Sequence, residues 1–161
     1  MSLTDPLIFV ALFGAAIFVW CGILRPNGYT TRDLYVIDGD TVADGERRIR
    51  LSGIDAPELS QVHGGAAKSH LKKLIKDRDV RVVVEGEDAY GRTLATLWTG
   101  KGNVCRAMVA DGYAVASSFE AHYASDMRTA KNHRRGLWAK GGIESPSDHR
   151  RRAGPMKRKI V

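Results

Sequence analysis

Two short runs of β-type sequence, Leu34–Val42 and Arg47–Ile54, are joined by Asp44-Gly45, and this pairing constrains the fold more than any other feature. An Asp-Gly step between two such runs is a strong signal for a β-hairpin. Further runs at Val80–Glu85 and Arg92–Thr99 have the β-branched content and the alternation of strands. The sequence therefore predicts a sheet of several short strands.

Four acids and one arginine lie within or directly after the first two runs. Asp38-Gly39-Asp40 forms a predicted turn, Arg50 lies within the second run, and Asp55 and Glu58 follow it. One interpretation is purely structural: Asp and Gly favour turns, and Pro57 with Glu58 suits the first turn of a helix. The other is a binding site, because acids with an arginine suit a hard cation and an anionic substrate.

Three motifs in a fixed order make the second interpretation specific. They are Asp38-Gly39-Asp40-Thr41, the segment from Arg50 to Glu58 (RLSGIDAPE), and Asp88-Ala89-Tyr90-Gly91-Arg92. In these motifs the chain resembles the staphylococcal (thermo)nuclease family over roughly residues 34 to 140. The resemblance implies an α+β fold, built as a small oligonucleotide/oligosaccharide-binding (OB) β-barrel with two or three α-helices.

The resemblance also implies an activity, the calcium-dependent hydrolysis of phosphodiester bonds in DNA and RNA. Asp40 and Asp55 are implied to bind one Ca²⁺, with the backbone carbonyl of Ala56 as a further ligand. Glu58 is implied to activate or orient the attacking water. We expect a monomer that favours single-stranded substrates.

Two arginines, Arg50 and Arg92, are implied to clamp the phosphate and to stabilise the transition state, and Tyr90 to lie beside the nucleotide. Three residues are expected to position these groups without contacting the metal or the substrate themselves: Asp38, Thr41 and Asp88. The chain departs from the family pattern in two places. Ala56 stands where Thr is common, and Ser117-Ser118 occupy the stretch where a second tyrosine would contact the nucleotide.

A non-catalytic OB-fold module that binds nucleic acid or protein at the membrane is the alternative. Such a module is expected to lose a metal-binding acid or a phosphate-clamping arginine, and this chain keeps all of them. Catalysis is therefore favoured. The five histidines show no metal-ligand spacing, so we expect neither a zinc site nor a histidine base.

The spacing of apolar residues predicts helices at Ala66–Ile75, Val104–Ala110 and Glu120–Arg134. Glycines shortly after the second and third of these segments mark the ends of the helices. Trp98 and Trp138 are expected in the core. These assignments give a domain at 34–142, preceded by a linker at 26–33 and followed by a basic disordered tail at 143–161. Residues 148–161 hold six basic residues against one acid, and the whole chain of 161 residues has a net charge of +7.

Before the domain, Leu7–Leu24 is an uncharged run long enough to cross a bilayer as a helix of about 27 Å. We expect residues 1–25 to be a single N-terminal transmembrane anchor, in a bacterial inner membrane. The alternative is a cleaved signal peptide, but residues 1–6 contain no Lys or Arg and no Ala-x-Ala-like site follows. A lipidated Cys21 is less favoured, because Trp20 before it is bulky.

The orientation of the anchor is open. Arg25 and Arg32 after the run favour a cytoplasmic domain by the positive-inside rule. A nuclease among its host's nucleic acids is a hazard, which favours the periplasmic or extracellular side. We prefer the outward placement.

Overall fold

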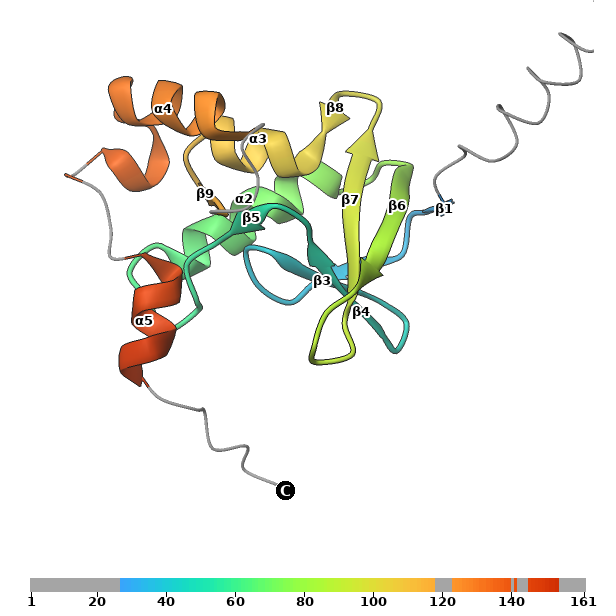
Figure 1. The fold of residues 1–161 in the computed structure, drawn as a ribbon. Helices are drawn as coiled ribbons and strands as arrows, with labels where there is room; N and C mark the ends of the chain where they lie inside the picture. The colour runs from blue at the N-terminus through green and yellow to red at the C-terminus, as the bar shows by residue number, and fades with distance from the viewer. Residues whose placement is uncertain (1–26, 118–122, 140, 142–144, 154–161) are drawn as a thin grey trace, which may run out of the picture.

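The computed structural model describes residues 27–117, 123–139, 141 and 145–153, which form an α+β fold (Figure 1). The strands are β1 (Gly28–Thr31), β2 (Leu34–Val36), β3 (Thr41–Asp44), β4 (Arg47–Leu51), β5 (Ile54–Asp55), β6 (Val80–Glu87), β7 (Thr93–Thr99), β8 (Gly102–Asn103) and β9 (Val115–Ala116). The helices are α2 (Gly64–Ile75), α3 (Val104–Ala110), α4 (Ala124–Asn132), the 3₁₀ turn η2 (Gly136–Trp138) and α5 (Pro146–Ala153).

The main sheet has the order β1-β6-β7-β4-β3-β2, with β8 added beside β7, and β5 pairs separately with β9. The predicted hairpin is confirmed: β3 and β4 pair antiparallel from Asp44↔Arg47 to Thr41↔Arg50. Strand β4 then pairs in parallel with β7, so the sheet curls into a half-barrel. This arrangement fits the predicted OB fold.

Helices α2 and α3 lie against the curled sheet and bury its inner face (Figure 1). The core consists of fully buried apolar side chains from both layers, among them Val42, Ile49, Leu71, Leu97 and Met108. Helix α2 follows the expected pattern, because Ala67, Leu71 and Ile75 are buried at helical spacing. The sheet and the two helices thereby share one apolar core.

The predicted first strand, Leu34–Val42, is in fact two strands. The amide groups of Ile37 and Asp38 both donate to the carbonyl of Thr41, at 2.9 and 3.2 Å, so the chain turns back between β2 and β3. The two halves then pair with each other antiparallel. This turn places the buried side chain of Asp40 beside Arg50 of β4.

The predictions for the segment at 26–33 and for Trp98 were wrong. The proposed linker at 26–33 contains β1, which pairs with β6 from Gly28↔Val83 to Thr31↔Val80. Its sequence, GYTT, carries little apolar pattern because it is an edge strand with exposed positions. Trp98 also differs from the expectation, since 43% of its surface is exposed.

The predicted disordered tail contains a helix, α5. Pro146 occupies its first position, Asp148 its first turn and Arg150, Arg151 and Arg152 its last turn. Proline tolerates the first helical position, and acids at the start and bases at the end complement the helix dipole. The described residues therefore contain four α-helices rather than two or three.

The expected third helix, Glu120–Arg134, corresponds to α4 at Ala124–Asn132, and its first residues lie outside the described part. The apolar run at Leu7–Leu24 also lies outside it. Among the residues that the structure describes, no helix has the length and apolar character needed to cross a membrane.

Gly39, in the turn between β2 and β3, is required by packing rather than by backbone conformation. It does not adopt a positive φ. A Cβ atom built on Gly39 would lie 2.6 Å from the Cβ of Ala56 and 2.8 Å from the Cβ of Ala67 in α2. The turn thus sits directly on α2 and on the segment after β5, and this contact fixes where the neighbouring acids lie.

Gly39→Ala should therefore destabilise the domain by about 1–3 kcal/mol, the usual cost of overpacking a tight contact. The matched control is Gly65→Ala in α2, where an added Cβ meets nothing within 4 Å. That control should keep or raise stability, by up to about 1 kcal/mol, because alanine favours helix over glycine. Chemical denaturation of both variants checks this, and equal stabilities would contradict the packing role of Gly39.

Candidate active site

The centre of the site is Arg50, whose guanidinium bridges two acids. Its Nη1 lies 2.9 Å from Asp40 Oδ1, and its Nη2 lies 3.0 Å from Asp55 Oδ1. The side chains are largely buried, with 19% of Arg50, 7% of Asp40 and 11% of Asp55 exposed. Burial lowers the pKa of Arg50, but the charges of Asp40 and Asp55 outweigh it and raise the pKa overall.

Asp40 is held by its neighbours on both carboxylate oxygens. The hydroxyl of Thr41 donates to Oδ1 at 3.0 Å, and the amide of Ala56 donates to Oδ2 at 3.0 Å. Burial raises the pKa of Asp40, and the nearby Asp38 adds to this, while Arg50 lowers it in part. Ionised Asp40 is therefore costly in this fold, and it favours further positive charge beside it.

Asp38 supports the turn rather than the cluster. Its Oδ1 accepts the amide of Asp40 at 3.1 Å, a turn in which the side chain replaces a backbone acceptor. The expectation that Asp38 supports the metal and substrate groups stays a prediction.

The segment from Asp55 to Gly64 forms linked turns and not the start of a helix. Glu58 donates its amide to Gln61 Oε1 at 2.8 Å, and Gln61 donates its amide to the carbonyl of Glu58 at 2.8 Å. Helix α2 begins only at Gly64. The structural interpretation of Pro57 and Glu58 as a helix start is therefore wrong, and the turns leave the Glu58 carboxylate beside Asp55.

A second arginine, Arg150 of α5, reaches the same acids. Its Nη2 donates to both oxygens of Asp55, at 2.9 and 2.8 Å, and its Nη1 donates to Glu58 Oε1 at 2.8 Å. Burial lowers the pKa of Arg150, but the bonds to Glu58 and Asp55 raise it overall. Sequence reasoning placed this arginine in a disordered tail. The signal that could have found it is the helix-start pattern Ser145-Pro146 with Asp148.

The third motif forms a separate cluster. Arg92 contacts Asp88 Oδ2 through both Nε and Nη2, each at 2.7 Å, and stacks over the ring of Tyr90 at 5.6 Å. Burial raises the pKa of Asp88, but hydrogen bonds from the amides of Arg92 and Tyr90 and from the Arg92 side chain lower it overall. Arg92 stands two residues before Leu94, the register partner of Arg50, so it lies about 7 Å along the sheet from that position.

The donors of the Arg50 cluster fit a hard cation. Within the described residues, no group of three or more His, Cys, Asp or Glu side chains is placed to hold a metal, so a cation at this cluster would rely on Asp40 and Asp55 together with backbone and water oxygens. The contacts above occupy three of the four lone-pair sites of the Asp40 carboxylate and leave about one for a cation. Without the contacts of Arg150, about three sites of Asp55 are available. Two carboxylates completed by a carbonyl and water are ligands that Ca²⁺ accepts.

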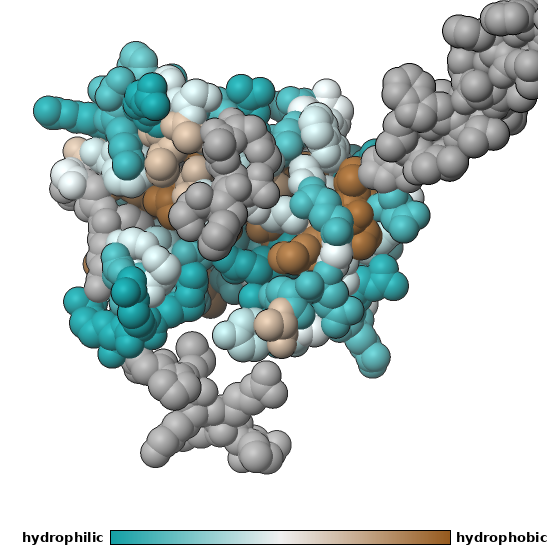
Figure 2. Space-filling view, in the orientation of Figure 1, coloured by the Kyte–Doolittle hydropathy of each residue, from teal (hydrophilic) through white to brown (hydrophobic). Residues whose placement is uncertain are grey.

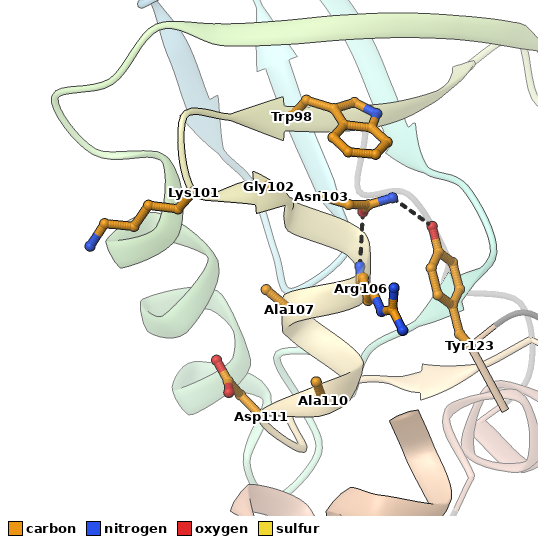
Figure 3. A pocket seen from close by; sticks show the side chains of 9 residues that line it. All are labelled: Trp98, Lys101, Gly102, Asn103, Arg106, Ala107, Ala110, Asp111 and Tyr123. Atoms are coloured by element: carbon orange, nitrogen blue, oxygen red, sulfur yellow. Dashed lines mark hydrogen bonds between the residues drawn. The ribbon is translucent and has the colours of Figure 1, made fainter. Parts of the chain in front are cut away.

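A separate hollow of about 610 Å³ lies between β7, β8 and α3 (Figure 3). Asn103 organises it, accepting the amide of Arg106 at 2.9 Å and donating to the hydroxyl of Tyr123 at 3.2 Å. Trp98 and Lys101 also line it, and no residue of the three motifs does. The hollow is therefore distinct from the acid cluster.

Comparison with known proteins matches residues 48–140 to the family described as staphylococcal nuclease homologue. The chain is 36% identical over 130 residues to an uncharacterised endonuclease of Haemophilus influenzae, covering 76% of this chain and 73% of that protein. It is 31% identical over 118 residues to the thermonuclease of Staphylococcus hyicus, covering 66% and 70%. A staphylococcal-like nuclease of Arabidopsis thaliana is 36% identical over 107 residues, which are 65% of this chain and 33% of the plant protein.

The bridge made by Arg50 predicts a stability effect. Arg50→Ala leaves buried Asp40 without its guanidinium and should cost about 3–5 kcal/mol at neutral pH, as for other broken buried pairs. The folded pKa of Asp40 lies above its unfolded value, so the folded state binds the extra proton and regains stability as the pH falls through that raised pKa. Denaturation at pH 7 and pH 5, with chelator present, measures this. A loss that is independent of pH would contradict the proposed origin.

Proposed function

Because the chain belongs to the staphylococcal nuclease family, we propose that it is a calcium-dependent nuclease that hydrolyses phosphodiester bonds in DNA and RNA. The observation that carries the proposal is the cluster in which Arg50 joins Asp40 and Asp55, with Glu58 beside it. Relatives in this family are named as endonuclease and thermonuclease. Hydrolysis of a phosphodiester needs an activated water and positive charge at the phosphoryl oxygens.

Asp40, Asp55 and the backbone carbonyl of Ala56 would hold Ca²⁺. Bound there, the ion would supply positive charge to the phosphoryl oxygens. Glu58 is suited to accept a proton from the attacking water, because its carboxylate is adjacent to Asp55 and partly exposed.

The two arginines of the family motifs have different capacities for a phosphate. Three of the contacts of Arg50, with Asp40, Asp55 and the carbonyl of Ile54, use its Nη groups and leave about two of its five N–H donors. Arg92 uses its Nε and Nη2 on Asp88 alone and keeps about three. Arg92 is therefore the better candidate for the phosphate clamp, and Arg50 combines that role with positioning the acids.

Cleavage should depend on Ca²⁺ and on Arg92. A fragment that begins at Asn27 keeps β1, whereas one beginning at Thr30 would cut that strand. We expect the fragment that begins at Asn27 to cleave single-stranded DNA and RNA when Ca²⁺ is present. Addition of a chelator should stop the cleavage. Arg92→Ala should reduce the rate by the order of 10²-fold or more, by analogy with other transition-state donors.

Arg128→Ala in α4 is the matched control, because it removes one exposed positive charge away from the acids and should leave the rate near that of the unchanged fragment. Binding of nucleic acid without cleavage under all conditions would instead support the non-catalytic module.

We further propose that Leu7–Leu24 stays attached and holds the nuclease at a membrane, with the domain on the outer side. The support is the uncharged length of this run and the missing basic residues before it. Full-length protein should fractionate with membranes, and protease added to spheroplasts should digest the domain. A soluble mature protein starting near residue 25 would show a signal peptide instead, and full protection would reverse the orientation.

A further inference from the structure

Helix α5 lies beside the turn between β5 and α2, set apart from α3 and α4 (Figure 1). Polar contacts connect it to the domain. Arg150 binds Asp55 and Glu58, which precede it by 95 and 92 residues, and His149 Nε2 lies 3.2 Å from Ser60 Oγ. Pro146 is buried at the start of the helix. The corresponding corner of the molecular surface is strongly hydrophilic (Figure 2).

These contacts use the acids that the proposed chemistry needs. Arg150 takes a lone pair on each oxygen of Asp55, the expected metal ligand, and one on Glu58, the expected base. Together with Arg50, Arg150 leaves about one of the four lone-pair sites of Asp55, and its positive charge repels a cation that approaches the same oxygens.

The charge balance shows what can replace Arg150. Without it, Asp40, Asp55 and Glu58 outnumber Arg50 by two negative charges. A Ca²⁺ ion together with one phosphodiester anion carries a net charge of +1, the same as the guanidinium. The side chain of Arg150 is 42% exposed, so its bonds are of the kind that exchange readily with solvent and ions.

We propose that α5 is an autoinhibitory segment in which Arg150 covers Asp55 and Glu58 until Ca²⁺ and a substrate phosphate displace it together. The inference rests on the proposed function of the same acids. Arg151 is not part of this contact, since it pairs with Asp148 within α5. The two adjacent arginines therefore provide a matched comparison.

Calcium binding to the full chain in detergent, measured by calorimetry with the metal alone, tests the contact without relying on activity. Arg150→Ala should tighten the Kd for Ca²⁺ roughly three- to tenfold, the range expected when a partly exposed charge-assisted contact is removed. Arg150→Lys should fall between, because it keeps the charge but loses the two-pronged contact. Arg151→Ala should leave the Kd unchanged.

Displacement of α5 can be followed directly by trypsin cleavage after Arg151 and Arg152. In the full chain, Ca²⁺ with a phosphorothioate oligonucleotide should speed this cleavage several-fold, and Ca²⁺ alone should have a smaller effect. A chain ending at residue 144 should bind Ca²⁺ as tightly as Arg150→Ala does, which controls for any misfolding of the point variant.

The outcomes separate the two proposals. An unchanged Kd in Arg150→Ala and in the shortened chain, with calcium-dependent cleavage of DNA intact, would overturn the autoinhibitory role alone. Absence of calcium binding and of cleavage in every variant would overturn the proposed function and the autoinhibitory role together.

Discussion

The ion pairs of Arg50 with Asp40 and Asp55 are the interaction on which the rest of the site depends. Burial makes an ionised carboxylate costly, and the guanidinium between the two acids offsets part of that cost. The arrangement requires Arg50 to lie beside the first acid, and the hairpin provides this: Arg50 is the cross-strand partner of Thr41, the residue after Asp40. Parallel pairing of β4 with β7 then holds the strand from its other side.

The close packing of Gly39 also fixes the position of the neighbouring acids. Gly39 lets the first turn touch both Ala56 and Ala67, so the turn, the segment after β5 and helix α2 meet at one point. The amide of Ala56 donates to Asp40 across this contact. Backbone contacts thus fix the position of Asp40 in the folded domain, and such preorganisation is what catalysis by electrostatics requires.

The two arginines at the acids differ in how firmly they are held. Arg50 comes from a central strand and is mostly buried, so its charge is a fixed part of the fold. Arg150 comes from a helix near the end of the chain and remains 42% exposed. The same negative cluster thus carries one permanent and one exchangeable positive charge, and that difference follows from burial alone.

Local pattern in the sequence predicted strands over Arg47–Ile54 and Val80–Glu85, which correspond to β4 (Arg47–Leu51) and β6 (Val80–Glu87). It also predicted the hairpin turn and the helix at 104–110, and it contains the acids and arginines of the family motifs. These features depend on local pattern: alternation, turn residues and motif spacing. Tertiary structure decided the break between β2 and β3, the edge strand β1, the exposure of Trp98 and the approach of Arg150 to Asp55. The break between β2 and β3 comes from hydrogen bonds to Thr41 a few residues away, whereas β1 and Arg150 each depend on a partner distant in sequence. An edge strand is specified by the strand it joins, and an arginine in a basic segment acquires a role only when folding brings carboxylates within hydrogen-bond distance.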